Sequence, residues 1–154
     1  DASIKNVKVA NIHSQKNNLK IEYLNCSPEQ LEQPEKFDII LNLEIVEHVE
    51  DINLYFESCN KLIKKNGLMF TATINRSLMS YLKAIIGAEY VLRWLPIGTH
   101  DWNKFLKPEE LENKLINHNF STLDVKGLVF NPFRGTWKKS DDLSVNYIIS
   151  SYKI

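Results

Sequence analysis

The chain has 154 residues, of which 44% are hydrophobic and 25% are charged, the balance expected of a globular protein with one domain. Its 19 basic and 19 acidic residues give a formal net charge of +0. This balance argues against a nucleic-acid partner, because nucleic-acid-binding proteins normally carry an excess of basic residues. The two cysteines, Cys26 and Cys59, have no CxxC spacing and predict two reduced thiols.

Helix and strand patterns alternate along the first half of the chain. A helix is expected at 3–16, and alternating apolar and polar residues predict a strand at 19–25. The continuous apolar run at 36–43 is typical of a central strand covered on both faces. A helical stripe follows at 51–65, and then a second buried strand at 68–74. This alternation predicts an α/β fold.

The limits of the helix expected at 51–65 can be read from its flanking residues. Asp51 precedes the apolar stripe and is expected to be its N-cap. Asn66 and Gly67 follow it, and they supply residues that tolerate the left-handed conformation that ends many helices. We therefore expect the helix to end directly before Asn66.

The second half of the chain continues the pattern. Pro108 opens a helix expected at 108–119, and strands are expected at 120–130 and 145–154. The last two strands follow each other without a helix between them, so we expect an antiparallel pair. The chain is expected to be a single domain over 1–154.

One segment, an insertion at about 76–104, stands outside this alternation. It is too long for a simple loop between a strand and a helix. Within Leu78–Trp94, a helical wheel gathers apolar residues on one side, with Ser80 opposite. Charged residues make a transmembrane span improbable. Three readings remain open: a lid over an apolar substrate, an amphipathic helix on a membrane surface, or a helix packed on the core.

Four stretches together resemble one known family. They are "EIVEHVED", "TATINRS", "IIGAEYVLRWLPIGTHDWNKFLKPEEL" and "GLVFNPFRGTW". The chain resembles the ubiquinone-biosynthesis O-methyltransferases over essentially its whole length. That family belongs to the class I methyltransferases that use S-adenosylmethionine, and it methylates polyprenylated catechols and phenols. The resemblance implies a Rossmann-like sheet with an antiparallel C-terminal strand pair.

The resemblance also implies parts that this chain does not contain. The family begins with an amphipathic region, a first strand and a glycine-rich turn that holds the methionine part of the cofactor. A second strand then ends in an acid that binds the ribose hydroxyls, and Asp1 in "DAS" matches that acid. We therefore expect the chain to lack the first strand or strands and the glycine loop. On its own, it is expected to be incomplete and inactive.

Three positions are implied as cofactor-binding residues. Asp1 matches the ribose acid, and Ser27 lies in the turn that borders the adenine, although a purely structural turn is an equally good reading. Leu43, at the carboxyl end of the expected strand at 36–43, matches the position beside the methionine part. Ligands of open α/β sheets bind beyond such strand ends, which supports the placement of Leu43.

Three polar residues, Glu44, Glu47 and His48, directly follow that strand. If the backbone turns helical there, they occupy i, i+3 and i+4 and share one face. Two carboxylates so close repel unless a cation lies between them, and carboxylates with one imidazole suit magnesium, manganese or zinc. The resemblance implies a metal triplet at these positions, with magnesium first. A solvated helical turn is the other reading.

Methyl transfer to a phenol requires loss of the phenolic proton. A divalent ion on adjacent catechol oxygens lowers the phenol pKa, or His48 takes the proton as general base. His100 and Asp101 in the insertion are further candidates for the substrate mouth, and the alternatives are that they pair with each other or stabilise a turn. Asn131, after the strand at 120–130, is a candidate for the same pocket.

The expected partners follow from the substrate class. A polyprenyl tail resides in the bilayer, so Leu78–Trp94 is expected to contact a membrane surface, helped by Trp94 and Trp102. We expect a cytoplasmic protein peripheral to the inner membrane, or to the matrix face in a mitochondrion, and a ubiquinone-biosynthesis complex as a further partner. The alternative function is a non-catalytic, membrane-associated lipid-binding protein on the same fold.

Overall fold

A computed structural model describes residues 1–33, 36–82, 85–86, 90, 93, 96, 98–99, 101–131 and 134–154. The chain divides into two compact units, Asp1–Glu35 and Lys36–Ile154. The expectation of one domain over 1–154 stays a prediction.

The first unit contains one helix and one short 3-10 turn. Helix α1 spans Ile4–Lys16. Ser3 is its N-cap, and the Ser3 hydroxyl accepts the Asn6 N–H at 3.4 Å. The turn η1 spans Pro28–Gln30. The strand predicted at 19–25 is wrong, since this segment is irregular and none of residues 1–33 lies in a strand. An alternating sequence becomes a strand only when a neighbouring strand pairs with its backbone.

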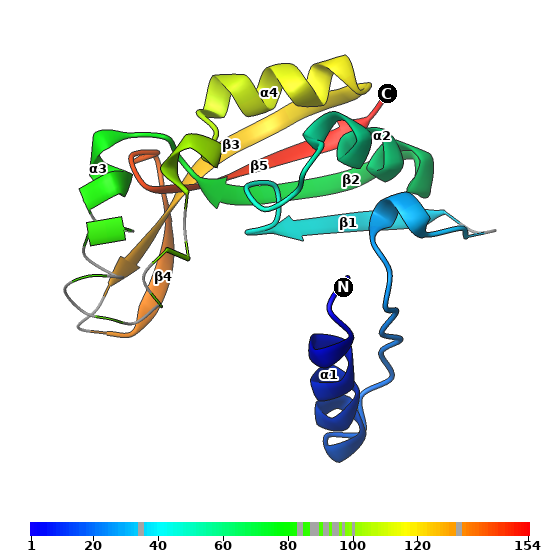
Figure 1. The fold of residues 1–154 in the computed structure, drawn as a ribbon. Helices are drawn as coiled ribbons and strands as arrows, with labels where there is room; N and C mark the ends of the chain where they lie inside the picture. Colours follow the sequence, from blue (N-terminus) through cyan, green and yellow to red (C-terminus); the bar gives the residue numbers. More distant parts are fainter. Residues whose placement is uncertain are drawn as a thin grey trace. The chain divides into compact units, whose positions relative to one another are not determined.

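The second unit is built on a five-stranded sheet (Figure 1). Its strands, in chain order, are β1 (Phe37–Leu43), β2 (Ile63–Ile74), β3 (Phe120–Asn131), β4 (Thr136–Ser140) and β5 (Asn146–Lys153). Their order across the sheet is β1-β2-β5-β3-β4. The helical elements are α2 (Ile52–Leu62), α3 (Leu78–Ser80), the 3-10 turn η3 (Trp102–Lys104) and α4 (Pro108–Asn117).

The sheet is mixed, which confirms the expected antiparallel C-terminal pair. Strands β1 and β2 run parallel, while β5 pairs antiparallel with both β2 and β3. Strand β4 was not predicted, because "TWKKS" lacks an apolar alternation; it is an edge strand that pairs only with β3 among the described strands. Lysines are common on such edges, where they discourage pairing with other chains.

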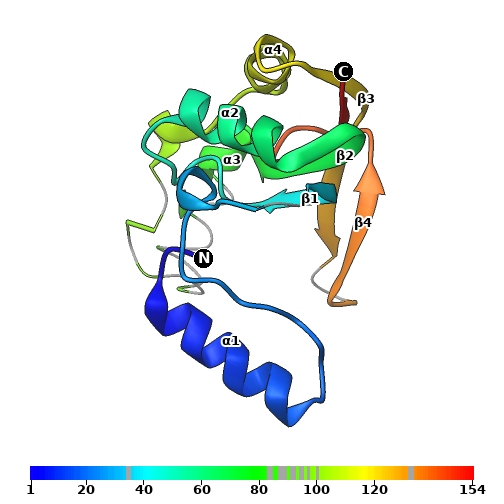
Figure 2. The same ribbon diagram turned by 90° about the vertical axis from the view of Figure 1, so that its right-hand side faces the viewer.

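Helices α2 and α4 lie on one face of the sheet, as the two ribbon views agree (Figures 1 and 2). The core lies between them and that face, and it includes Tyr55, Phe56, Met69, Leu111, Leu115, Phe120, Tyr147 and Ile149. The opposite face of β1 is not covered as predicted, because Ile39, Leu41 and Leu43 are more than half exposed. The apolar run of β1 therefore packs through alternate residues only.

The junction of α2 and β2 confirms one predicted boundary and corrects another. Asp51 is the N-cap, and its carboxylate accepts the N–H groups of Asn53 and Leu54 at 2.8 and 3.1 Å. The helix ends at Leu62, and β2 begins directly afterwards, so Asn66 lies inside the strand. Asn66 has the left-handed φ of +61° that its sequence predicts, where the register between β1 and β2 shifts.

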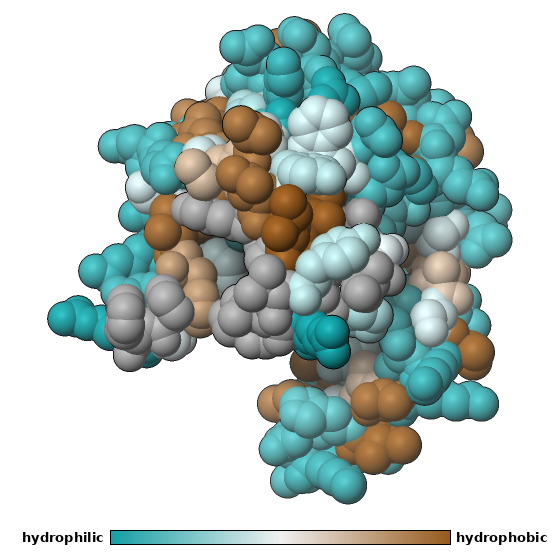
Figure 3. Space-filling view, turned by 60° about the vertical axis from the view of Figure 1, so that its left-hand side comes forward, coloured by the Kyte–Doolittle hydropathy of each residue, from teal (hydrophilic) through white to brown (hydrophobic). Residues whose placement is uncertain are grey.

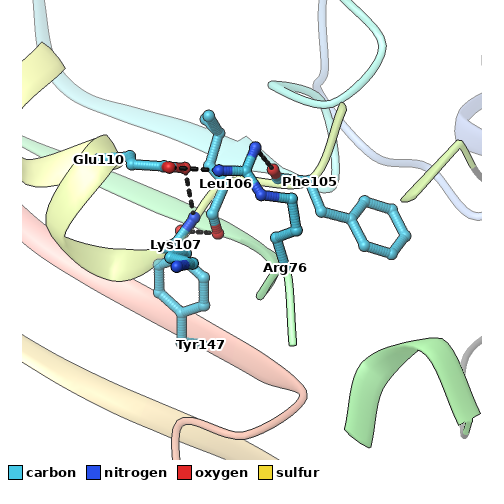
Figure 4. Close-up of polar contacts among 6 residues, drawn as sticks. All are labelled: Arg76, Phe105, Leu106, Lys107, Glu110 and Tyr147. Atoms are coloured by element: carbon cyan, nitrogen blue, oxygen red, sulfur yellow. Dashed lines mark hydrogen bonds and ion pairs between the residues drawn. The ribbon is translucent and has the colours of Figure 1, made fainter. Parts of the chain in front are cut away.

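The two ends of the insertion are tied together at the start of α4 (Figure 4). Arg76, two residues after β2, forms an ion pair with Glu110 and donates to the Phe105 carbonyl at 3.3 Å. Glu110 also accepts the Lys107 N–H at 3.0 Å, which caps α4. Tyr147 on β5 donates to the carbonyl of Leu106 at 2.9 Å, and its pKa is raised by burial and then by Glu110. The segment before α4 is therefore held against the sheet.

Close backbone packing at Gly127 on β3 gives a test of this fold. A Cβ atom at this position would overlap the carbonyl of Asp142. Because the atom that it meets belongs to the backbone of the connection between β4 and β5, Gly127→Ala should push this connection away from β3 and destabilise the protein by about 2 kcal/mol. Thermal unfolding should show a lower Tm for Gly127→Ala than for the control Asn113→Ala on the exposed face of α4. Equal Tm values would contradict the register of β3.

Candidate active site at the end of strand β1

The site begins where β1 ends. Glu44, the first residue after Leu43, has a φ of +53°, a left-handed conformation that is uncommon for a residue with a side chain. Its N–H donates to the carbonyl of Ala72 on β2 at 2.9 Å, so the neighbouring strand holds this conformation. Residues held in sparsely populated backbone regions cluster at functional sites.

A turn, and not a helix, follows Glu44. The N–H of His48 donates to the carbonyl of Ile45 at 2.8 Å, and α2 begins only at Ile52. The helical backbone that would place Glu44, Glu47 and His48 on one face is therefore not formed. The left-handed φ of Glu44 bends the chain, and helix α2 begins only after its N-cap, Asp51.

Glu47 is a buried carboxylate held by Thr73. Only 3% of the residue is exposed. Its Oε2 accepts a hydrogen bond from the hydroxyl of Thr73 on β2 at 2.7 Å. Its Oε1 is buried and has no hydrogen-bond partner among the described residues. A buried carboxylate oxygen without a donor is costly, and such groups in proteins usually serve a ligand or a proton.

The carboxyl groups of Glu44 and Glu47 interact directly. Burial raises the pKa of Glu44 from 4.5 to about 7, and the charge of Glu47 and a hydrogen bond between the two carboxyl groups add to the shift. The pair therefore holds a proton up to near-neutral pH. Paired carboxyls of this kind can exchange a proton or bind a cation.

The predicted metal triplet is not gathered into one cluster. Across the described parts of the chain, no three or more His, Cys, Asp and Glu side chains form a group that could hold a metal ion. Two of the three predicted ligands, Glu44 and Glu47, do meet, whereas His48 is exposed. The structure thus brings together a carboxyl pair with a histidine nearby in sequence.

The predicted cofactor-binding residues lie in both units. In the first unit, the Asp1 carboxylate accepts the Ser3 N–H at 2.8 Å and the Asn6 side-chain amide at 3.3 Å. The Ser27 N–H donates to the Gln30 side chain at 3.3 Å at the start of η1. In the second unit, Leu43 closes β1 with its side chain exposed. Their shared role in holding the cofactor stays a prediction.

Two further candidates, Asp101 in the insertion and Asn131 at the end of β3, make local contacts. Asp101 accepts the Asn103 N–H at 3.0 Å and caps η3, which is the turn-stabilising alternative. The side chain of Asn131 accepts the Arg134 N–H at 3.2 Å. His100 and Trp94 lie outside the described residues. Trp102 donates to the carbonyl of Ser77 at 3.2 Å.

Sequence reasoning missed Thr73, which contacts the site from β2. The pattern "TAT" at 71–73 contains a usable signal, because alternate residues of a strand face the same side. Thr71 and Thr73 are both fully buried on that side. When a buried threonine at the carboxyl end of a strand lies beside a buried glutamate, a hydrogen bond between the two side chains is expected.

Comparisons with known proteins agree with this architecture. Residues 1–71 match a family described as a methyltransferase domain. The ubiquinone biosynthesis O-methyltransferase of Pelagibacter ubique is 54% identical over 99% of this chain, and that of Bartonella tribocorum is 50% identical over 97%. The chain spans 64% and 61% of the lengths of these two relatives.

Solved structures show the same fold. An S-adenosylmethionine-dependent methyltransferase from Aquifex aeolicus matches 100% of this chain and 66% of its own, with a TM-score of 0.70 at 10% identity. The magnesium protoporphyrin IX methyltransferase of Synechocystis, solved with bound S-adenosylhomocysteine, matches 100% of this chain and 62% of its own, with a TM-score of 0.63 at 14% identity. The fold is the Rossmann-like fold of class I methyltransferases.

The raised pKa of Glu44 predicts a pH dependence of stability. The folded state holds the proton more tightly than the unfolded state, so the stabilisation is complete below pH 4.5 and is lost as the pH rises through about 7. Glu44→Gln should therefore stabilise the protein relative to wild type at pH 8.5, by roughly 1 kcal/mol after allowance for solvent screening, and less at pH 5.

Thermal unfolding at both pH values checks this expectation, with Glu57→Gln as the control. Lys61 lowers the pKa of Glu57, so this control should gain no stability at high pH. An equal effect of Glu44→Gln at pH 5 and pH 8.5 would contradict the carboxyl pair.

Proposed function

We propose that the chain belongs to the family of ubiquinone biosynthesis O-methyltransferases and that it methylates a hydroxyl group of a polyprenylated catechol or phenol with S-adenosylmethionine as donor. The observation that carries the proposal is the identity of about half of all residues over nearly the whole chain. Because the chain spans less than two thirds of these relatives, the reaction is proposed for the protein expressed from the complete gene.

The end of β1 supplies the groups that such a reaction needs. S-adenosylmethionine provides an electrophilic methyl group, and the acceptor oxygen attacks it in line after losing its proton. Glu44 and Glu47 lie beyond the carboxyl end of a parallel strand, where ligands of open α/β sheets bind. Glu44, with its pKa raised to about 7, is suited to accepting a phenolic proton, and the imidazole of His48 is a second candidate acceptor beside it in sequence.

A divalent cation fits the carboxyl pair better than the complete triplet. The buried Oε1 of Glu47 has no partner among the described residues, and repulsion from Glu47 helps to keep Glu44 protonated. Glu44 and Glu47 would hold such a cation, which would relieve this repulsion and would supply the charge that lowers the pKa of a catechol hydroxyl. A site with two carboxylates leaves coordination positions for water and for the substrate. Such a site favours magnesium over manganese or zinc. His48 then serves as the proton acceptor.

Contact with a membrane surface is proposed for the insertion. Leu78, Met79, Tyr81 and Leu82 are exposed, with Leu78 at 74%, whereas Ile85 is buried. Hydrophobic side chains gather on the side of the molecule where α3 lies (Figure 3). No helix in the described part of the chain is long and apolar enough to cross a membrane. An apolar surface of this kind suits shallow insertion, and the polyprenyl tail gives it a purpose.

The wheel predicted for this insertion is corrected in one respect. Ser80, expected to lie opposite the apolar stripe, is fully buried, and its hydroxyl donates to the carbonyl of Asn75 at 2.5 Å. The exposed apolar side chains therefore point outward from an element that is anchored through a serine.

We propose on the grounds of the substrate class that the protein lies at the cytoplasmic face of the inner membrane, or at the matrix face in a mitochondrion. We propose on the same grounds that it is a member of a ubiquinone-biosynthesis complex.

A non-catalytic lipid-binding protein is the alternative function. The relatives described above carry the name of an enzyme, which gives this alternative no support. Retention of a buried Glu47 with an unpartnered oxygen, beside the left-handed Glu44, also favours chemistry over lipid storage, because both features destabilise a fold that does not use them.

The proposed reaction predicts distinct effects for the three residues at the end of β1. With a short-chain catechol and S-adenosylmethionine, Glu47→Ala should lower kcat by about 100-fold or more, because both the ion and its partner carboxyl lose their position. Glu44→Ala should raise the magnesium concentration needed for half-maximal activity. His48→Ala should lower kcat even at saturating magnesium, because the phenolic proton then loses its acceptor.

Transfer of a labelled methyl group, measured across a magnesium titration, checks these effects. Glu57→Ala, which alters an exposed glutamate on α2, should behave as wild type. Methyl transfer at the wild-type rate by Glu47→Ala would contradict the proposed role of the carboxyl pair.

The proposed membrane contact predicts a loss of vesicle binding. Replacing both Leu78 and Leu82 by Ser should weaken binding to phosphatidylglycerol–phosphatidylcholine vesicles about tenfold or more, because each leucine contributes its burial in the bilayer. Ile116→Ser, at an equally exposed apolar position on α4, is the matched control. Cosedimentation measures the binding, and equal binding of the double variant and wild type would contradict the proposal.

A further inference from the structure

We infer that Thr73 is a positioning residue, which orients the Glu47 carboxylate so that one of its oxygens is held without a protein partner for the reaction. This inference rests on the proposed function for its effect on turnover, but its geometric part stands on contacts between described residues.

Strand β2 holds both ends of the carboxyl pair. The carbonyl of Ala72 accepts the Glu44 N–H at 2.9 Å, and the hydroxyl of Thr73 donates to Glu47 Oε2 at 2.7 Å. Consecutive residues of one strand therefore fix the backbone of one glutamate and the side chain of the other. Because β1 and β2 pair in parallel from Ile39 to Leu43, this support is rigid.

The contact of Thr73 with Glu47 is sealed from water. Thr73 is fully buried and Glu47 is 3% exposed, so solvent does not compete for this hydrogen bond. Hydrogen bonds to a buried charged group are stronger than those between neutral groups. The carboxylate has two oxygens, and the hydroxyl occupies only one of them. Oε1 consequently stays unpartnered among the described residues while its direction is fixed.

A carboxylate without this donor would have a different geometry. Glu47 lies in a turn, with an irregular backbone on both sides, so no helix or strand of its own restricts its side chain. Rotation of the carboxylate would bring Oε1 to another donor and remove the unpartnered oxygen. Residues behind a reacting group commonly change activity 10- to 100-fold when they are replaced.

Thr71 offers a matched control on the same strand. It lies two residues earlier on the same face of β2, it is fully buried, and its hydroxyl has no hydrogen-bond partner among the described residues. Thr71→Val and Thr73→Val thus make the same chemical change in similar surroundings, and only Thr73→Val removes a contact with Glu47.

The test combines crystal structures with kinetics of the protein expressed from the complete gene. In Thr73→Val, the Glu47 carboxylate should leave its position, and kcat for a short-chain catechol should fall about tenfold or more, while KM for S-adenosylmethionine changes by less than about twofold. Thr73→Ser should restore both the position and kcat. Thr71→Val should match wild type. If Thr73→Val does not fold, Thr73→Ala takes its place.

Two results would overturn the inference: a Glu47 carboxylate that keeps its place without the hydroxyl, or one that moves without a change in kcat. If the wild type itself transfers no methyl group, the proposed reaction fails. In that case the crystal structures still decide whether Thr73 orients Glu47, so the two failures can be told apart.

Discussion

The parallel pairing of β1 with β2 is the constraint on which the site depends. This pairing brings Leu43 beside Ala72, so the residue that follows β1 comes within reach of the end of β2. The backbone of Glu44 then bonds to Ala72, and the side chain of Glu47 bonds to Thr73. A shift of one residue in this register would move both contacts and turn alternate side chains to the other face of the sheet.

The same strand connects the site with the insertion. Two residues after β2, Arg76 is paired with Glu110, and the Ser77 carbonyl accepts the indole N–H of Trp102. The start and the end of the insertion are therefore anchored to one another beside the strand that supports Glu47. The exposed apolar side chains of α3 and the carboxyl pair at the end of β1 are therefore both fixed to β2.

The sequence predicted the parts of this structure that depend on local patterns. The N-cap at Asp51, the left-handed Asn66 and the helix opened by Pro108 follow from residue types with strong backbone preferences, and the described structure contains all three. The importance of the stretch at 44–48 was also visible, since two glutamates and a histidine directly follow an apolar strand.

The misses have a common physical cause, which is that they depend on partners distant in sequence. The segment 19–25 has a strand pattern but no neighbouring strand, and β4 exists only because β3 pairs with it. The chain turns after β1 because Ala72 holds Glu44 in a left-handed conformation. The alternation in "TAT" places Thr71 and Thr73 on one face, but the contact of Thr73 with Glu47 depends on the register of the sheet.

The central claim is that the end of β1 binds the hydroxyl groups that receive the methyl group. The most direct measurement is a crystal structure of the protein expressed from the complete gene, with S-adenosylhomocysteine and a short-chain catechol. The account predicts that the catechol oxygens lie beside the carboxyl groups of Glu44 and Glu47, directly or through one shared cation. A catechol bound without contact to residues 44–48 would contradict it.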